Sequence, residues 1–160
     1  MLSHLHYFFI LLYILFIPIL DLKYSKEIQT IEGAKVGDCI CLCEPKELNA
    51  IRWVFDGNNP NNFLPRALIS HPKQEDCKKE CKGWALSFYE TSEKAINSFS
   101  EKCKHTRNIY KYLGTHIAEI KIEKTDGVNS KIELDGHFSH FEYLDTDFPK
   151  KIGVIKKVYP

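Results

Sequence analysis

Four residues of this chain have the types and the spacing that could hold a metal ion. Cys77 and Cys81 are four residues apart, so a helix would place both sulfur atoms on one side. Cys103 and His105 would complete a set of three cysteines and one histidine, which suits tetrahedral zinc. A free cysteine also packs as a small buried hydrophobic residue, and that alternative stays open. A zinc-stabilised interaction domain is therefore one function that the sequence suggests.

A second candidate is the segment His137-Phe138-Ser139-His140, in which polar and aromatic side chains are most concentrated. His137-x-Ser139 fits half of the His-x-Ser/Thr pattern of two-histidine phosphoesterases, but the sequence holds no second copy of that pattern. In a strand, His137 and His140 would point to opposite faces. We therefore expect one histidine in solvent and the other hydrogen-bonded in the core. His137 is retained as a candidate catalytic residue.

Two arginines, an aromatic segment and a helix start follow one another in the middle of the chain. Arg52-Trp53 and Arg66 precede residues 83–89 (GWALSFY), which lead into residues 91–95 (TSEKA). This order resembles that of small ADP-ribosyltransferase-like domains, including the RES type. Such domains have an arginine on an early strand and an aromatic or serine-bearing strand that leads into a helix. Residues 116–122 resemble the strand that follows that helix.

The resemblance implies a site for NAD. It would place NAD near Arg52 or Arg66, with the Tyr89 ring stacked on the nicotinamide. The late catalytic glutamate of the family has Glu119 or Glu142 as its counterpart in this chain. An NAD-consuming enzyme is therefore an alternative function, and its candidate catalytic residues are Arg52, Arg66, Tyr89, His137 and Glu142.

The charge balance disfavours one class of partner. The chain has 22 lysines and arginines against 21 aspartates and glutamates, a formal net charge of +1. Proteins that bind nucleic acid mostly carry a strong basic excess, so we expect no nucleic-acid partner. The sequence also lacks the glycine-rich patterns that cradle phosphates, Gly-x-Gly-x-x-Gly and Gly-x₄-Gly-Lys.

The first 22 residues are strongly apolar, and Asp21 is the only charged side chain among them. Residues 2–20 reach the length of about 20 residues that a membrane-spanning helix needs. We expect residues 1–22 to be a membrane anchor that contacts lipid through residues 5–22. A cleaved signal peptide, a buried helix and a mistaken start remain alternatives.

The residues that flank this segment predict its orientation. Lys23, Lys26 and Lys35 follow it, whereas no lysine or arginine precedes it. The positive-inside tendency then places the main domain in the cytoplasm. Cysteines are mostly reduced in that compartment, so the sequence also predicts free thiols.

The remaining pattern predicts one α+β domain over residues 39–160, joined to the apolar segment by a linker at 23–38. Thr91 or Ser92 can cap a helix whose apolar stripe is Ala95, Ile96, Phe99 and Cys103, and a second short helix ends at Gly114. We expect a mostly antiparallel sheet packed by this helical hairpin and preceded by the apolar helix. The main predicted strands cover residues 39–43, 51–55, 84–89, 116–122, 131–134 and 151–159.

No complete catalytic set emerges from these patterns. The primary expectation is a small membrane-tethered α+β protein that acts as a non-catalytic binding or regulatory module. The NAD-consuming enzyme and the zinc-stabilised domain are its two alternatives. NAD and zinc are thus both candidate cofactors, and the sequence favours neither.

Overall fold

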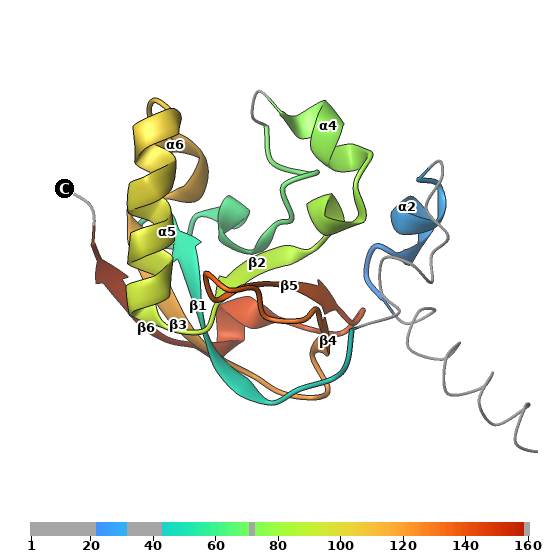
Figure 1. Ribbon diagram of the computed structural model, residues 1–160. Helices are drawn as coiled ribbons and strands as arrows, with labels where there is room; N and C mark the ends of the chain where they lie inside the picture. The colour runs from blue at the N-terminus through green and yellow to red at the C-terminus, as the bar shows by residue number, and fades with distance from the viewer. Residues whose placement is uncertain (1–21, 32–42, 71–72, 159–160) are drawn as a thin grey trace, which may run out of the picture.

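The computed structural model describes residues 22–31, 43–70 and 73–158. They form one six-stranded sheet, in which every pair of neighbouring strands is antiparallel. The strand order is β4-β5-β2-β1-β3-β6 (Figure 1). The strands are β1 (Leu48–Val54), β2 (Leu86–Tyr89), β3 (His116–Ile122), β4 (Gly127–Asn129), β5 (His137–Glu142) and β6 (Ile152–Lys157). The predicted α+β class with an antiparallel sheet is confirmed.

The principal helix starts where its sequence predicts. The Thr91 side chain accepts a hydrogen bond from the Lys94 N–H at 3.2 Å, which satisfies one of the free donors of the first turn. Ala95 and Phe99 on the predicted stripe are buried. Gly114, with φ of 89°, ends the next short helix. The helices are α2 (Ser25–Gln29), α4 (Gln74–Lys78), α5 (Ser92–His105) and α6 (Tyr110–Leu113), with 3-10 turns η1 (Pro60–Phe63), η2 (Cys81–Trp84) and η3 (Phe148–Lys151).

One face of the sheet, here called the core face, carries the largest buried side chains. Phe88 and Phe138 lie opposite each other on β2 and β5, and neither is exposed to solvent. Phe148 from η3 packs on Phe88 with ring centroids 5.6 Å apart. Phe63 from η1 packs on Phe148 in turn. Two short 3-10 turns therefore cover the core face, and no long helix from residues 22–31, 43–70 or 73–158 lies there.

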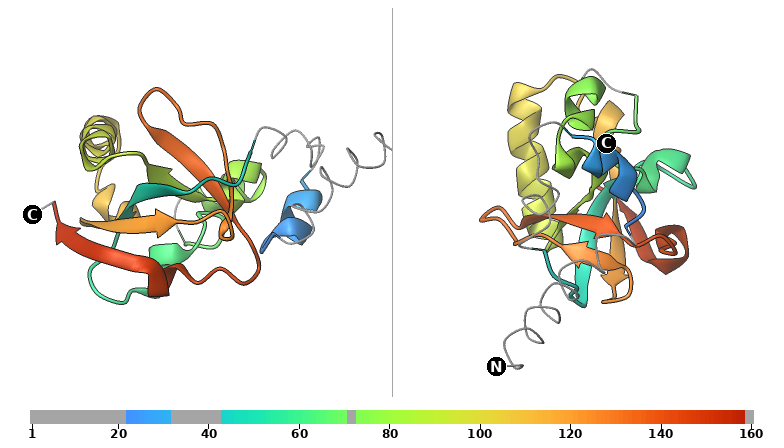
Figure 2. Two further views of the ribbon diagram at one scale, coloured as in Figure 1. Left: turned by 90° about the horizontal axis from the view of Figure 1, so that it is seen from below. Right: turned by 90° about the vertical axis from the view of Figure 1, so that its right-hand side faces the viewer.

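The opposite face, here called the helix face, carries two separate apolar clusters. α5 lies over one end, where Trp53 stacks on Phe99 with ring centroids 4.2 Å apart. α2 covers the other end, where Ile28 packs with Phe141. Ser87 and Ser139 form a cross-strand pair between the two clusters. This polar pair lies between the parts of the sheet that carry the two clusters. Figure 2 shows α5 and α2 over different parts of the sheet.

The segment predicted as a linker is folded over residues 22–31. Leu22 is buried and forms a β-bridge with Tyr143, while the Lys23 N–H donates to the Glu142 carbonyl at 2.9 Å. Ile28 in α2 is also fully buried. Polar composition suggested a solvated linker, but two apolar residues six positions apart are enough to dock this segment on the sheet.

Two further predictions differ from the structure. Residues 131–134 were expected as a strand, but they form a loop, and β4 lies at the turn expected at Asp126-Gly127. Among the residues that the structure describes, no helix has the length and apolar character to cross a membrane. The predicted apolar helix before residue 22 and the strand start at Cys39 lie outside the described residues.

Candidate functional site

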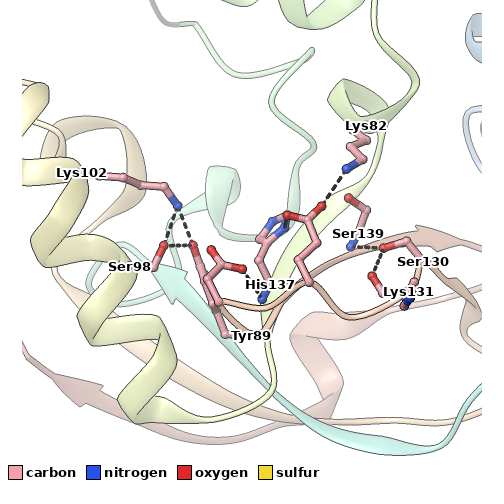
Figure 3. Close-up of polar contacts among 10 residues, drawn as sticks. Lys82, Tyr89, Ser98, Lys102, Ser130, Lys131, His137 and Ser139 are labelled. Carbon is pink, nitrogen blue, oxygen red and sulfur yellow. Dashed lines mark hydrogen bonds and ion pairs between the residues drawn. The ribbon is translucent and has the colours of Figure 1, made fainter.

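A lysine and two hydroxyl groups meet where β2 leads into α5. The Lys102 ammonium donates to the Tyr89 hydroxyl at 2.7 Å and to Ser98 Oγ at 3.0 Å, and the two hydroxyls lie 3.0 Å apart. Ser98 and Lys102 are four residues apart, so they share one side of the helix. Because the Thr91 cap starts α5 directly after β2, that side faces Tyr89. Figure 3 shows Lys102 reaching from α5 toward Tyr89, with Ser98 beside it.

The charge of Lys102 is not neutralised within the described part of the chain. Its neighbours on the same helix are paired, Lys94 with Glu90 and Lys104 with Glu101. Lys102 itself has only hydroxyl partners there, and its ammonium also lies 5.4 Å from the centre of the Tyr89 ring. An ammonium group has three N–H donors, of which two are used here. The remaining donor and the full positive charge are available to an anion.

His137 extends this site along the sheet. Its ring meets that of Tyr89 edge-on, with centroids 5.4 Å apart. Glu133 lies 3.9 Å from His137 Nδ1 and also binds Lys82 at 2.8 Å. Burial lowers the pKa of His137, and the nearby Lys102 charge lowers it further, while Glu133 acts in the opposite direction. We call Tyr89, Ser98, Lys102 and His137 the Lys102 cluster.

The candidate catalytic residues do not converge. Tyr89 and His137 are cross-strand partners on the helix face. Arg52 pairs with Ala118 and Glu142 with Gly127, which puts both on the core face. Arg66 is exposed in the loop after η1. The sheet thus separates two pairs of side chains that the NAD-consuming alternative would use together.

Arg52 is part of the fold's internal hydrogen bonding. Its guanidinium donates to the carbonyls of Asn62 at 2.6 Å, Ser87 at 2.9 Å and Leu64 at 3.2 Å. The rings of Phe63 and Phe88 lie within 6 Å of it. Burial lowers the pKa of Arg52 to about 10, partly opposed by Glu142. These carbonyl contacts hold the η1 loop on the sheet and leave few donors for a ligand.

Glu142 is buried near the docked N-terminal segment. Its carboxylate lies 3.3 Å from the Lys23 ammonium, in an ion pair that is open to solvent only on the lysine side. Burial raises the pKa of Glu142, whereas Lys23 and Arg52 lower it. The pair fastens residue 23 to β5, which is a structural role.

His140 is the buried member of the histidine pair, as expected. Its Nδ1 donates to Asn129 Oδ1 at 2.7 Å, and its Nε2 lies 3.3 Å from the Asp126 carbonyl oxygen. Burial lowers its pKa to about 4, so the ring is neutral at neutral pH. His137 is half-buried rather than solvated.

The predicted zinc ligands do not come together. Cys77 is buried in α4, Cys103 lies on the stripe of α5, and His105 is exposed at the end of that helix. No three His, Cys, Asp or Glu side chains among residues 22–31, 43–70 and 73–158 could hold a metal ion. Cys81 is disulfide-bonded, so the expectation of a free thiol is wrong for this residue. Disulfide connectivity is not readable from spacing in one sequence.

Sequence reasoning found Tyr89 and His137 but missed Ser98 and Lys102. A signal was present, because Ser98 and Lys102 are one helical turn apart beside the apolar stripe of a well-predicted helix. What the sequence does not show is that the Lys102 ammonium contacts the hydroxyls of Tyr89 and Ser98 and has no carboxylate partner in the described structure. Comparisons with protein-family models, with curated proteins and with solved structures find no match.

Proposed function

We propose that this protein is a non-catalytic binding module whose Lys102 cluster holds an anionic group of the ligand. One observation carries this proposal. The Lys102 ammonium is oriented by the hydroxyls of Tyr89 and Ser98, and no carboxylate within the described residues pairs with it. An oriented, unpaired ammonium beside two hydroxyl groups matches the needs of a phosphate or carboxylate oxygen, which accepts charge-assisted hydrogen bonds.

The surroundings support binding rather than catalysis. Catalysis by the NAD-consuming alternative would need Arg52, Tyr89 and Glu142 around one substrate, and they lie on opposite faces of the sheet. Arg52 is occupied by three backbone carbonyls. His137, whose pKa is lowered by burial, lies beside Tyr89 at the rim of the cluster.

Calorimetric titration of the full-length chain in detergent tests the proposal, with inorganic phosphate and NAD as separate probes. Lys102→Gln removes the charge and keeps a polar side chain. Lys111→Gln, on the exposed side of α6, is the matched control. We expect saturable binding of at least one anion, weakened about tenfold or more by Lys102→Gln, since a hydrogen bond to a charged group contributes roughly 1.5–3 kcal/mol.

Two results would contradict this reasoning. If the Lys102→Gln and Lys111→Gln proteins bind the anion with equal affinity, the anion does not bind at the Lys102 cluster and the proposal is wrong. Release of nicotinamide from NAD by the purified chain would show that the protein is an NAD-consuming enzyme and not a non-catalytic binding module.

We further propose that residues 5–21 tether this module to a membrane. Leu22, which was predicted to belong to the anchor, is instead buried on the sheet. Support for the tether comes from the apolar composition and length of residues 5–21. The lysines that follow favour a domain on the cytoplasmic side, whereas a disulfide at Cys81 favours an oxidising compartment. Recovery of the full chain in the soluble fraction without detergent would refute the tether. Protease protection in sealed membranes would decide between the two sides.

A further inference from the structure

Strand β6 is an open edge of the sheet. It is last in the strand order, and within the residues that the structure describes it pairs with β3 alone (Figure 2). The Val154 side chain is 53 % exposed and Ile155 is 38 % exposed, although both are apolar. Edge strands that expose apolar side chains are templates for pairing with another strand.

The register shows which backbone groups of β6 are open. The Val158 N–H donates to the Thr115 carbonyl at 3.1 Å, and antiparallel hydrogen-bonded pairs recur every second residue. The pairs Ile117–Lys156 and Glu119–Val154 therefore continue this ladder. The N–H and C=O groups of Ile155 and Lys157 consequently point away from β3. They are free to pair with a further strand.

The charge of this edge indicates what kind of strand fits. Lys156 and Lys157 are exposed, and neither has an ion-pair partner among the residues with described positions. The strand itself holds no acidic residue. Lysines at an edge oppose pairing with a like edge, so a second copy of β6 is disfavoured. Acidic side chains on the incoming strand would neutralise both lysines.

We propose that β6 is a docking edge for an extended segment of a partner protein. The segment pairs antiparallel to β6 and carries two adjacent acidic residues followed by two apolar residues. In this arrangement the acidic side chains lie opposite Lys157 and Lys156, and the apolar ones lie opposite Ile155 and Val154. Each face of the sheet then gains one ion pair and one apolar pair, because neighbouring side chains alternate between faces.

Fluorescence anisotropy with the full-length chain in detergent tests this proposal. The probe is a labelled peptide, Thr-Glu-Glu-Val-Val-Thr, and the control peptide has two lysines in place of the glutamates. We expect saturable binding of the glutamate peptide and at least about tenfold weaker binding of the lysine peptide, since like charges across an interface are strongly unfavourable. Equal binding of both peptides, or no binding of the glutamate peptide, would overturn the proposal.

Two variants locate the contact. Ile155→Pro removes an outward N–H that β3 does not use, and proline is tolerated in edge strands. Lys156→Glu with Lys157→Glu leaves the backbone unchanged and should reverse the preference between the two peptides. Lys111→Glu is the charge control and should leave binding unchanged. Binding that survives both β6 variants would place the peptide elsewhere and refute the docking edge.

Self-association is a separate outcome. If sedimentation shows a dimer that Ile155→Pro dissociates, the edge pairs with a second copy and the acidic partner is wrong. Neither variant touches the Lys102 cluster, so failure here is distinguishable from failure of the anion site.

Discussion

The pH dependence of stability at His140 gives a sharp test of the buried network. The His140 ring is fully buried between Phe88 and Phe148 and bonded to Asn129. Its pKa falls from an ordinary value of 6.5 to about 4 in the folded chain. The folded state therefore binds fewer protons than the unfolded state below about pH 6.5, so the stability that His140 contributes is complete above that pH and is lost as the pH falls toward 4.

The size of the effect follows from this shift. The lowering of the His140 pKa from 6.5 to about 4 corresponds to about 3 kcal/mol in the free energy of unfolding. About 2 kcal/mol of this is lost between roughly pH 7.5 and pH 5. His140→Phe keeps an aromatic ring in place but removes the titrating group. At neutral pH the free energy of unfolding of the variant should be about 1–3 kcal/mol lower than that of the native chain, because Asn129 Oδ1 is left without a donor.

Urea denaturation, followed by tryptophan fluorescence at several pH values, measures both quantities. The free energy of unfolding of the native chain should fall by about 2 kcal/mol more than that of His140→Phe between roughly pH 7.5 and pH 5. Glu142 has a raised pKa and therefore stabilises the folded state as the pH falls, opposite to the effect of His140. Because both proteins contain Glu142, its contribution cancels when their free energies of unfolding are compared. His105→Gln, at an exposed position, is the control. Parallel pH curves for native and His140→Phe proteins would show that folding does not lower the pKa of His140.

Three further substitutions test the fold through urea denaturation. Thr91→Ala removes the cap of α5 and should cost about 1 kcal/mol; no change would mean that the cap is not formed. Gly114 has a φ of 89°, and a Cβ added there would collide with the Val54 carbonyl. Gly114→Ala should therefore lower the free energy of unfolding by more than about 1 kcal/mol. Arg52→Lys keeps the charge but cannot donate to all three backbone carbonyls, so it should lower the free energy of unfolding by about 2 kcal/mol or more. The control Arg107→Lys, at an exposed position, should leave the free energy of unfolding almost unchanged.

Local rules predicted the elements whose information is local. The alternation in residues 116–122 gives β3 with the observed bounds. The Thr91 cap and the apolar stripe give α5, and Gly114 gives the stop after α6. Such signals depend on neighbours within a few positions, so one sequence is enough to read them.

Elements that depend on distant contacts were missed. Residues 137–144 were expected only as an extended or irregular segment, because the two histidines and the serine of β5 obscured a strand in which five consecutive residues, 138–142, are buried. His140 is tolerated in the core because Asn129, eleven positions earlier, supplies a partner. α2 is folded because β4 and β5 offer apolar side chains to Ile28, which its own sequence does not reveal.

The candidate site shows the same division. His137 was named from its polar and aromatic surroundings and Tyr89 from the family resemblance, and the two lie together. Arg52 and Glu142 were named with them but lie on the other face. A one-residue difference in strand parity decides between faces. Lys102 escaped notice because lysines are frequent in this chain, and only the three-dimensional arrangement shows that its ammonium contacts the hydroxyls of Tyr89 and Ser98.

The docking of Leu22 on Tyr143 also limits how the domain can turn. The chain enters the sheet beside β5, four strand spacings or about 19 Å from β6. Because the bridge and the Lys23 backbone bond clamp that entry point, an attachment made through earlier residues has no swivel at residue 22. The described chain therefore begins beside β5 and lies four strands away from the β6 edge that is proposed to receive a partner segment.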